Sequence, residues 1–172
     1  MMRRVREVMS SPVVTVTPDT LVKDAAALLA EKNVSGAPVM EGGDIVGVFS
    51  EVDILRSLKT TKKNLRLVFP SVSSIGIAFQ EELVQRELLE AYEEIGAMPV
   101  SEVMSKQIHT VDDDITLKDA VVAMVKNNVN RLPVLKAGEL VGIITRGDVI
   151  KGLANNSNGR VEVAGDTAQA VE

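Results

Sequence analysis

The chain carries the stretch VREVMSSPVVTVTPDTLVKDAAALLAEKNVSGAPVMEGGDIVGVFSEVDILRSL at Val5–Leu58 and writes it again, with substitutions, as VSEVMSKQIHTVDDDITLKDAVVAMVKNNVNRLPVLKAGELVGIITRGDVIKGL at Val100–Leu153. The two copies align without a gap. Identical pairs include Met9 with Met104, Asp24 with Asp119, Pro38 with Pro133, Gly47 with Gly142 and Asp53 with Asp148. A repeat of this size predicts one supersecondary unit used twice, in which each copy covers apolar surface that the other cannot bury alone.

Each copy predicts a helix after its opening segment. Apolar residues recur at i, i+3, i+4, i+7 and i+8 from Val22, and again from Leu117, which is the spacing of one buried helix face. In the second copy Thr116 stands three residues before Asp119 and predicts a capping box. The first copy has Leu21 at that place, so its helix is expected to begin without a side-chain cap.

The remaining segments of each copy predict strands and a second helix. Val13–Val16 and Ile108–Val111 are rich in β-branched residues and are expected to be extended. The segments 38–49 and 133–144 predict hairpins, each followed by a short helix. The order is therefore β-α-β-β-α, a mixed α/β (α+β) fold. We expect the two repeats to pack sheet to sheet as a pseudo-twofold pair, because the bare face of each sheet needs a partner.

The composition excludes several classes of function. The 172 residues include no Cys and one His, which excludes disulfides and thiolate zinc sites and argues against a catalytic triad or a His-based metal site. A net charge of −5 argues against general affinity for nucleic acid, which depends on clustered Lys and Arg. No stretch approaches the roughly 20 apolar residues of a membrane span, and the start of the chain lacks the apolar core of a signal peptide. We expect a cytoplasmic protein.

An insert, residues 59–99, separates the copies and ends in a predicted helix near residues 80–95. We interpret the insert as a tether that packs on the outside of the module. Its apolar stretch LVFPSVSSIGIAF leaves a second interpretation open, a contact with an effector or with a second copy of the chain. The tail, residues 154–172, has little that could build a core and is expected to be mobile.

The first candidate site lies where each hairpin leads into the second helix, in Gly47–Asp53 (GVFSEVD) and Gly142–Asp148 (GIITRGD). Ser50 or Thr145, followed three residues later by Asp, is explained by helix capping. The same helix N-terminus would also receive phosphate oxygens, and the Asp would accept hydrogen bonds from a diol such as that of ribose. The residues alone leave both interpretations open.

The second candidate site is the entry to each hairpin, Gly36–Val39 (GAPV) and Arg131–Val134 (RLPV). Proline fixes φ and has no N–H, so neighbouring backbone groups could meet a flat polar partner such as a purine edge. A strand that begins with an edge proline explains the same sequence equally well.

These elements together resemble the cystathionine-β-synthase (CBS) domain in the tandem arrangement called a Bateman module. The resemblance covers both repeats and rests on motifs that occur twice in the same order: V-x-x-V-M-S, a strand, a helix, x-P-V, and glycine with two hydrophobic residues before S/T-x-x-D. It implies two pseudosymmetric clefts between paired sheets that bind adenosyl ligands such as AMP, ADP, ATP or S-adenosylmethionine. It also implies a homodimer formed through the repeats.

The resemblance assigns roles to individual residues. Asp53 and Asp148 would hold the ribose, and Ser50 and Thr145 would lie by the ribose or phosphate. The base would be framed by first-strand residues and by backbone at the hairpin entries: Thr15, Ala37, Pro38, Thr110, Leu132 and Pro133.

The two clefts are expected to differ because the residues around the motifs differ in charge. The second copy has His109, Arg131 and Arg146 where the first copy has Val14, Gly36 and Glu51. Cations favour phosphate through charge-assisted hydrogen bonds, whereas Glu51 would repel it. We therefore expect phosphate to prefer the cleft around Asp148. The alternative is that both arginines are solvated surface charges.

We expect a regulatory module that senses an adenosyl ligand, requires no cofactor and signals to an unidentified partner protein in trans. Nothing in the sequence provides an activated nucleophile or a metal cluster, so an enzyme is disfavoured. The alternative function is a protein-interaction scaffold with no small-molecule ligand. It predicts that no adenosyl compound stabilises the fold.

Overall fold

The computed structural model describes residues 3–60 and 86–154 of the chain. Packing divides the chain into two units whose boundaries do not follow the sequence copies. One unit consists of Met1–Val13 with His109–Glu172, and the other is Val14–Ile108. The opening segment of each copy therefore packs with the body of the other copy. The second copy has the predicted β-α-β-β-α order with a first strand of two residues, Val111–Asp112, whereas in the first copy the predicted strand Val13–Val16 is reduced to a single bridge between Val16 and Val39.

In the unit Val14–Ile108, the elements are α1 (Val22–Glu31), β1 (Gly36–Glu41), β2 (Asp44–Ser50), α2 (Glu51–Thr60), a helix at 86–96 and α4 (Val100–Val103). β1 and β2 form the predicted antiparallel hairpin. Its turn residues Gly42 and Gly43 have φ of 59° and 98°, which glycine adopts without steric cost. Gly36 pairs with Ser50, so the start of β1 lies beside the start of α2.

The core of this unit joins α1 to the hairpin. The predicted inner face of α1 is buried, with Val22 and Ala25 at 0% and Leu29 at 2% exposure. They pack in one cluster with Phe49 of β2, which is also fully buried. Burying one such large apolar side chain contributes about 1.5–3 kcal/mol. Leu21 stands at the N-cap of α1 and provides no side-chain cap, as predicted.

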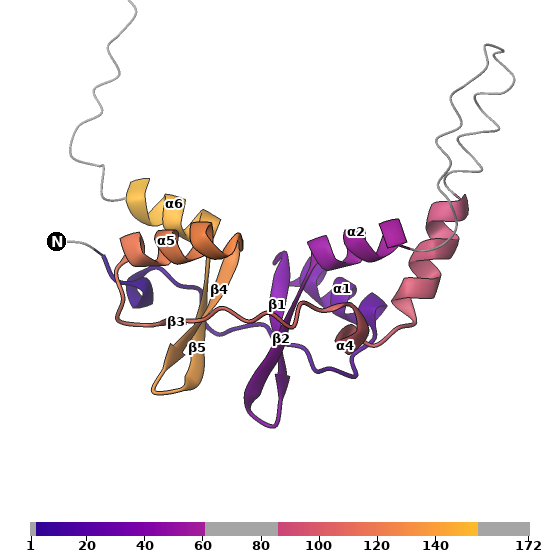
Figure 1. The fold of residues 1–172 in the computed structure, drawn as a ribbon, viewed down its shortest axis with the longest axis horizontal. Helices are drawn as coiled ribbons and strands as arrows, with labels where there is room; N and C mark the ends of the chain where they lie inside the picture. The colour runs from indigo at the N-terminus through magenta and orange to yellow at the C-terminus, as the bar shows by residue number, and fades with distance from the viewer. Residues whose placement is uncertain (1–2, 61–85, 155–172) are drawn as a thin grey trace, which may run out of the picture. The chain divides into compact units, whose positions relative to one another are not determined.

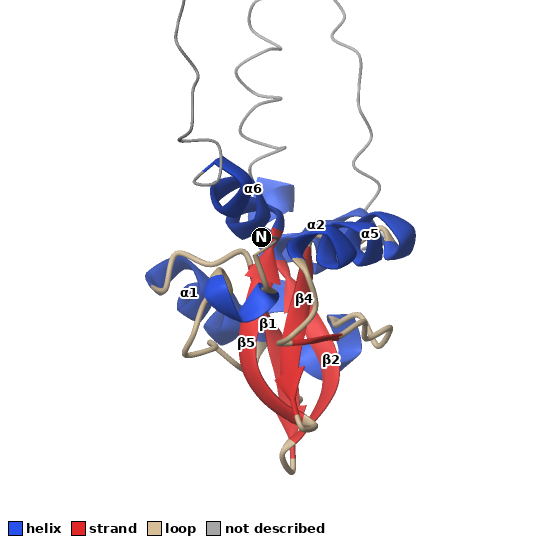
Figure 2. Ribbon diagram, turned by 90° about the vertical axis from the view of Figure 1, so that its left-hand side faces the viewer, coloured by secondary structure: helices blue, strands red, loops and turns tan. Residues whose placement is uncertain are grey.

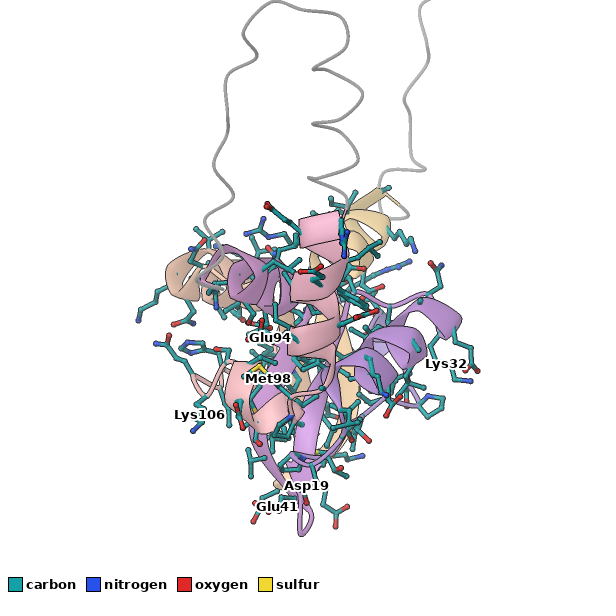
Figure 3. The ribbon with its side chains drawn as sticks, turned by 90° about the vertical axis from the view of Figure 1, so that its right-hand side faces the viewer. Asp19, Lys32, Glu41, Glu94, Met98 and Lys106 are labelled. Carbon is teal, nitrogen blue, oxygen red and sulfur yellow. The ribbon has the colours of Figure 1, made fainter. Side chains whose placement is uncertain are left out.

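The last part of the insert belongs to this core. Ile95, near the end of the helix at 86–96, is 3% exposed and lies in the same cluster as Phe49. Met98, where the chain passes from that helix to α4, packs against the cluster (Figure 3). The expectation of a tether outside the module therefore does not hold for this part. The apolar stretch of the insert and the tail after Ala154 lie outside the described residues.

In the other unit, the elements are η1 (Val5–Glu7), β3 (Val111–Asp112), α5 (Leu117–Asn127), β4 (Arg131–Lys136), β5 (Glu139–Thr145) and α6 (Arg146–Ala154). The sheet order is β3-β4-β5, with β3 parallel and β5 antiparallel to β4. α5 contacts α6, and both helices lie at the end of the β4–β5 hairpin away from its turn (Figure 1). Figure 2 shows the strands in red and the helices in blue.

The predicted cap of α5 is present. Thr116 accepts a hydrogen bond from the Asp119 N–H at 3.2 Å, and its hydroxyl donates to Asp119 Oδ2 at 2.7 Å. The helix ends at Asn127 and is followed by the C-cap residue Asn128, whose φ of 52° is left-handed. Its inner face, Leu117, Ala120 and Met124, is buried with Leu132 and Ile144 of the hairpin.

The opening segment of the first copy closes this unit. Val5 is fully buried, and its N–H donates to the carbonyl of Ile115 at 3.0 Å. Further along, Ser10 and Ile143 exchange two backbone hydrogen bonds of 2.9 and 3.0 Å. We call residues 3–10 the N-terminal strap. Nothing in the local sequence predicts these pairings, because the partners lie more than 100 residues apart.

An equivalent segment, residues 98–105, closes the unit Val14–Ile108, and we call it the central strap. Val100 is fully buried, and its N–H donates to the carbonyl of Thr20 at 2.8 Å. Ser105 and Val48 exchange two backbone hydrogen bonds of 2.9 and 3.0 Å. The repeat is therefore preserved in the packing as well as in the sequence. Among the helices described, none is long and apolar enough to cross a membrane.

Candidate functional site

The second-copy site is formed where β5 leads directly into α6. Asp148, in the first turn of α6, accepts two hydrogen bonds from Thr145 on the same oxygen, Oδ2: one from the hydroxyl at 2.7 Å and one from the backbone N–H at 2.9 Å. The Asp148 N–H donates back to Thr145 Oγ1 at 3.3 Å. This reciprocal pair is the helix cap. It leaves Oδ1 of the partly buried Asp148 carboxylate without a hydrogen bond from any described residue, so capping and ligand binding are compatible here.

Two arginines stand beside this cap. Arg131 begins β4 and pairs across the hairpin with Thr145, while Arg146 is the first residue of α6 and its side chain is exposed. The Arg146 N–H donates to the carbonyl of Asn130 at 3.1 Å, so this amide is engaged within the protein. The Thr145 N–H is engaged as well. Recognition of an anion at this place would therefore rely on the arginine side chains more than on these two amides.

The first-copy site has the equivalent residues, Ser50 and Asp53, but different hydrogen bonds. The Ser50 hydroxyl donates to Asp53 Oδ2 at 2.7 Å, and Arg56 Nη1 donates to Asp53 Oδ1 at 3.3 Å. The Asp53 side chain is only 5% exposed, whereas that of Arg56 is 67% exposed. Gly36 lies opposite Ser50 in the hairpin, and exposed Glu51 opens α2. Both oxygens of Asp53 are thus engaged, and exposed Glu51 opens the helix where the second copy has Arg146.

The residues expected to frame a base are largely inside the units. Ala37 and Leu132 are fully buried, and so are Pro38 and Pro133. The Pro38 carbonyl accepts a hydrogen bond from the Val16 N–H at 3.1 Å, so this acceptor is already engaged. At these positions the backbone is buried along with the side chain.

Thr15 and Thr110 are exposed beside the hairpin entries. Val16 bridges Val39 in parallel, and Val111 pairs in parallel with Val134. Each threonine is one residue earlier and thus stands at the level of the proline in the neighbouring strand. His109 precedes Thr110 and is partly buried. Within each unit, the structure therefore places the threonine, the hairpin entry and the start of the second helix around the same end of the hairpin.

The repeats match one family model, described as CBS domain, over residues 5–60 and again over 100–155. The chain belongs to the CBS domain family. The resemblance drawn from the motifs is thereby confirmed, and so is the mixed α/β fold built from two CBS repeats.

Two relatives align with the chain over most of their own length. An uncharacterised protein of Methanocaldococcus jannaschii, MJ1426, is 35% identical over 152 residues, which cover 87% of this chain and 90% of that protein. The CBS domain-containing protein YhcV of Bacillus subtilis is 30% identical over 92% of this chain and 91% of its own length.

Solved CBS pairs have the same fold. The crystal structure of CBSX2 from Arabidopsis thaliana has a TM-score of 0.68 at 27% identity and covers 93% of this chain and 100% of that chain. A second structure, of CBSX2 in complex with AMP, has a TM-score of 0.62 at 28% identity over 90% of this chain and 98% of that chain.

One residue of the candidate site, Arg56, was not predicted from the sequence. It stands three residues after Asp53 on α2, a spacing that places two helical side chains on the same face and could have revealed the pair. The equivalent position in the second CBS repeat is Lys151. Across residues 3–60 and 86–154, no group of three or more His, Cys, Asp or Glu side chains is arranged to hold a metal ion.

Proposed function

We propose that this CBS pair is a regulatory module that binds an adenosyl ligand, with AMP, ADP, ATP and S-adenosylmethionine as the candidates. The observation that carries the proposal is the Asp148 carboxylate. One oxygen holds the helix cap and the other accepts no hydrogen bond from a described residue, which is the acceptor that a ribose hydroxyl needs. A related CBS pair has been crystallised in complex with AMP, which supports the choice of ligand.

Each residue of the second-copy site has a proposed role. Asp148 accepts from the ribose hydroxyls, and Thr145 orients its carboxylate. Arg131 and Arg146 bind phosphate oxygens, since guanidinium groups form charge-assisted hydrogen bonds with them. His109 and Thr110 lie at the edge of the base. The first-copy site, with Asp53, Ser50 and Thr15, is the weaker one for phosphorylated ligands, because Glu51 replaces Arg146.

The module has no catalysis of its own in this proposal and acts on a partner protein in trans. A ligand shifts a conformational equilibrium only as far as its affinities for the two states differ. Signalling therefore requires that the adenosyl ligand bind more tightly to one arrangement of the repeats than to another, and that the partner recognise that arrangement.

A melting screen with AMP, ADP, ATP and S-adenosylmethionine tests the proposal. A ligand at 100 times its dissociation constant stabilises the folded state by about 2.7 kcal/mol, which raises the melting temperature by about 5–10 °C in a chain of this size. We expect at least one of the four to do so and to be recovered unchanged after a long incubation. If none of them shifts the melting temperature at millimolar concentration, the chain is better explained as a scaffold.

Self-association is the second part of the proposal. Apolar side chains on α5 and α6 are exposed, with Val122 at 55%, Val125 at 72% and Ile150 at 66%. Covering such a face with a second copy would remove apolar surface from water. We expect sedimentation to show a dimer and Val125→Glu to weaken it. A native chain that sediments as a monomer at micromolar concentration would contradict the dimer without affecting the ligand proposal.

A further inference from the structure

Asp53 and Asp148 occupy equivalent positions in the repeat, yet their carboxylates have different partners. In the second copy both bonds from Thr145 fall on Oδ2 of Asp148. In the first copy Ser50 occupies Oδ2 of Asp53, and Arg56 occupies Oδ1 at 3.3 Å. The oxygen that the second copy leaves available is therefore held by a guanidinium in the first.

We infer that Arg56 lowers the affinity of the first-copy site for adenosyl ligands, because it holds the Asp53 oxygen that a ribose hydroxyl would use. This inference rests on the proposed function and adds a determinant within it. Arg56 acts through Asp53 and not through a contact of its own with the base or phosphate. A ligand that enters the first-copy site must displace the guanidinium from Oδ1, whereas Oδ1 of Asp148 has no hydrogen bond from a described residue to displace.

The neighbouring residues support this assignment. Asp53 and Arg56 are three residues apart on α2, so the helix itself brings the two side chains together. Lys151 takes the place of Arg56 on α6, and its side chain is exposed. No hydrogen bond or ion pair joins Lys151 to Asp148, although both residues are described. The contact in the first copy is a single hydrogen bond from Arg56 Nη1 to Asp53 Oδ1 at 3.3 Å, and the second copy has no counterpart to it among the described residues.

The expected effect is moderate, because Arg56 is 67% exposed and water competes with the pair. Exposed ion pairs of this kind change an equilibrium by up to about fivefold. Removing the guanidinium should therefore tighten the first-copy site by about threefold to fivefold. The effect should also depend on salt, since the Debye length falls to about 3 Å at 1 M.

Calorimetric titration of adenosine tests the inference, because adenosine has the diol but no charge that salt could screen. Asp148→Ala isolates the first-copy site, and Arg56→Ala or Arg56→Lys is then added to it. We expect Arg56→Ala to tighten adenosine binding by about threefold to fivefold at low salt and to lose this gain near 1 M salt. Arg56→Lys, which keeps the charge but not the guanidinium, should give an intermediate affinity.

The matched control is Lys151→Ala in the Asp53→Ala background, which should change adenosine affinity by less than about twofold. Unchanged or weaker binding in Arg56→Ala, or a gain that persists at high salt, would overturn the role of Arg56. The proposed function fails separately: a native chain that binds neither adenosine nor any of the four candidate ligands refutes it, and the inference about Arg56 with it.

Discussion

Gly142, in the middle of β5, leaves the space that the side chain of Met9 occupies. A Cβ atom at Gly142 would overlap the Met9 sulfur and lie 2.9 Å from its Cγ. Gly47 in β2 receives Met104 in the same way, with the Met104 Cγ 3.1 Å from the Cβ position. Both pairs recur in the sequence repeat. Each methionine therefore packs its strap against the hairpin of the other sequence copy.

Replacing either glycine with alanine should destabilise the fold. Gly142→Ala forces Met9 out of its place, and overpacking of this kind costs about 1–3 kcal/mol. Gly47→Ala should cost at least as much, because the backbone oxygen of Ser105 also lies 3.0 Å from its Cβ position and cannot rotate away. The free energy of unfolding in urea measures both effects.

Gly147→Ala is the matched control. Its nearest neighbour would be Thr145 Oγ1 at 3.6 Å, an ordinary contact, and alanine is favoured over glycine in a helix by up to about 1 kcal/mol. We expect this variant to be as stable as the native chain or more stable. Equal stability of Gly142→Ala and the native chain would show that the strap tolerates repacking.

The N-terminal strap should depend on Val5 more than on its ion pairs. Arg4 and Arg6 both pair with Asp114, but all three side chains are 40–53% exposed, so Asp114→Asn should cost less than about 1 kcal/mol. Val5 is fully buried, and Val5→Ala should cost about 1.5–3 kcal/mol. Urea unfolding of the two variants distinguishes the contributions, and a larger loss in Asp114→Asn would show that charge holds the strap.

The end of the insert should contribute to the free energy of unfolding as a core segment does. Ile95 is 3% exposed, so Ile95→Ala should cost about 2–4 kcal/mol by removing apolar contacts and leaving a cavity. Leu89, on the same helix, is 63% exposed, and Leu89→Ala should change the unfolding free energy by less than about 0.5 kcal/mol. Similar small effects in both variants would restore the interpretation of the insert as an external tether.

Features of the fold that follow from neighbouring residues could be predicted from the sequence, whereas contacts between distant segments could not. The buried face of α1 and the Thr116 cap follow from spacings of three and four residues, and the structure has both. The contact of Met9 with Gly142 joins segments far apart in the chain, and no local pattern records it. The repeat shows that Met9 and Gly142 each have an equivalent in the other copy, but it does not show that the two residues contact each other. The sheet partner of each strap is therefore visible only in the fold.

The features of the candidate site also fall into those that local spacing predicts and those that depend on packing. The Ser/Thr-x-x-Asp spacing predicts the Thr145–Asp148 cap and the side-chain hydrogen bond between Ser50 and Asp53, because it follows from the geometry of a helix start. The buried state of Asp53 and the engaged Pro38 carbonyl depend on how the hairpin packs, which spacing does not contain. The charge difference between Glu51 and Arg146 is readable from the sequence. The three-residue spacing of Asp53 and Arg56 makes their pairing possible, and the rotamers of the two side chains decide that it forms.

The final prediction compares the two aspartates directly. Asp148→Ala removes a partly exposed acceptor that stands beside Arg131 and Arg146, and each charged hydrogen bond lost is worth about 1.5–3 kcal/mol. We expect it to weaken AMP and ATP binding by at least about tenfold, since 1.4 kcal/mol is a factor of ten. Asp53→Ala should weaken binding much less, because Asp53 is buried, paired with Arg56 and adjacent to Glu51.

Both substitutions also remove a carboxylate from the first turn of a helix. Each variant therefore loses up to about 1 kcal/mol of stability, which must be measured in the unliganded proteins and subtracted. Calorimetric titration of AMP and ATP into the two variants then gives the comparison. An equal loss of affinity in both, or a larger loss in Asp53→Ala, would refute the assignment of the main site to the second repeat, because the available Asp148 oxygen and the two arginines belong to that repeat alone.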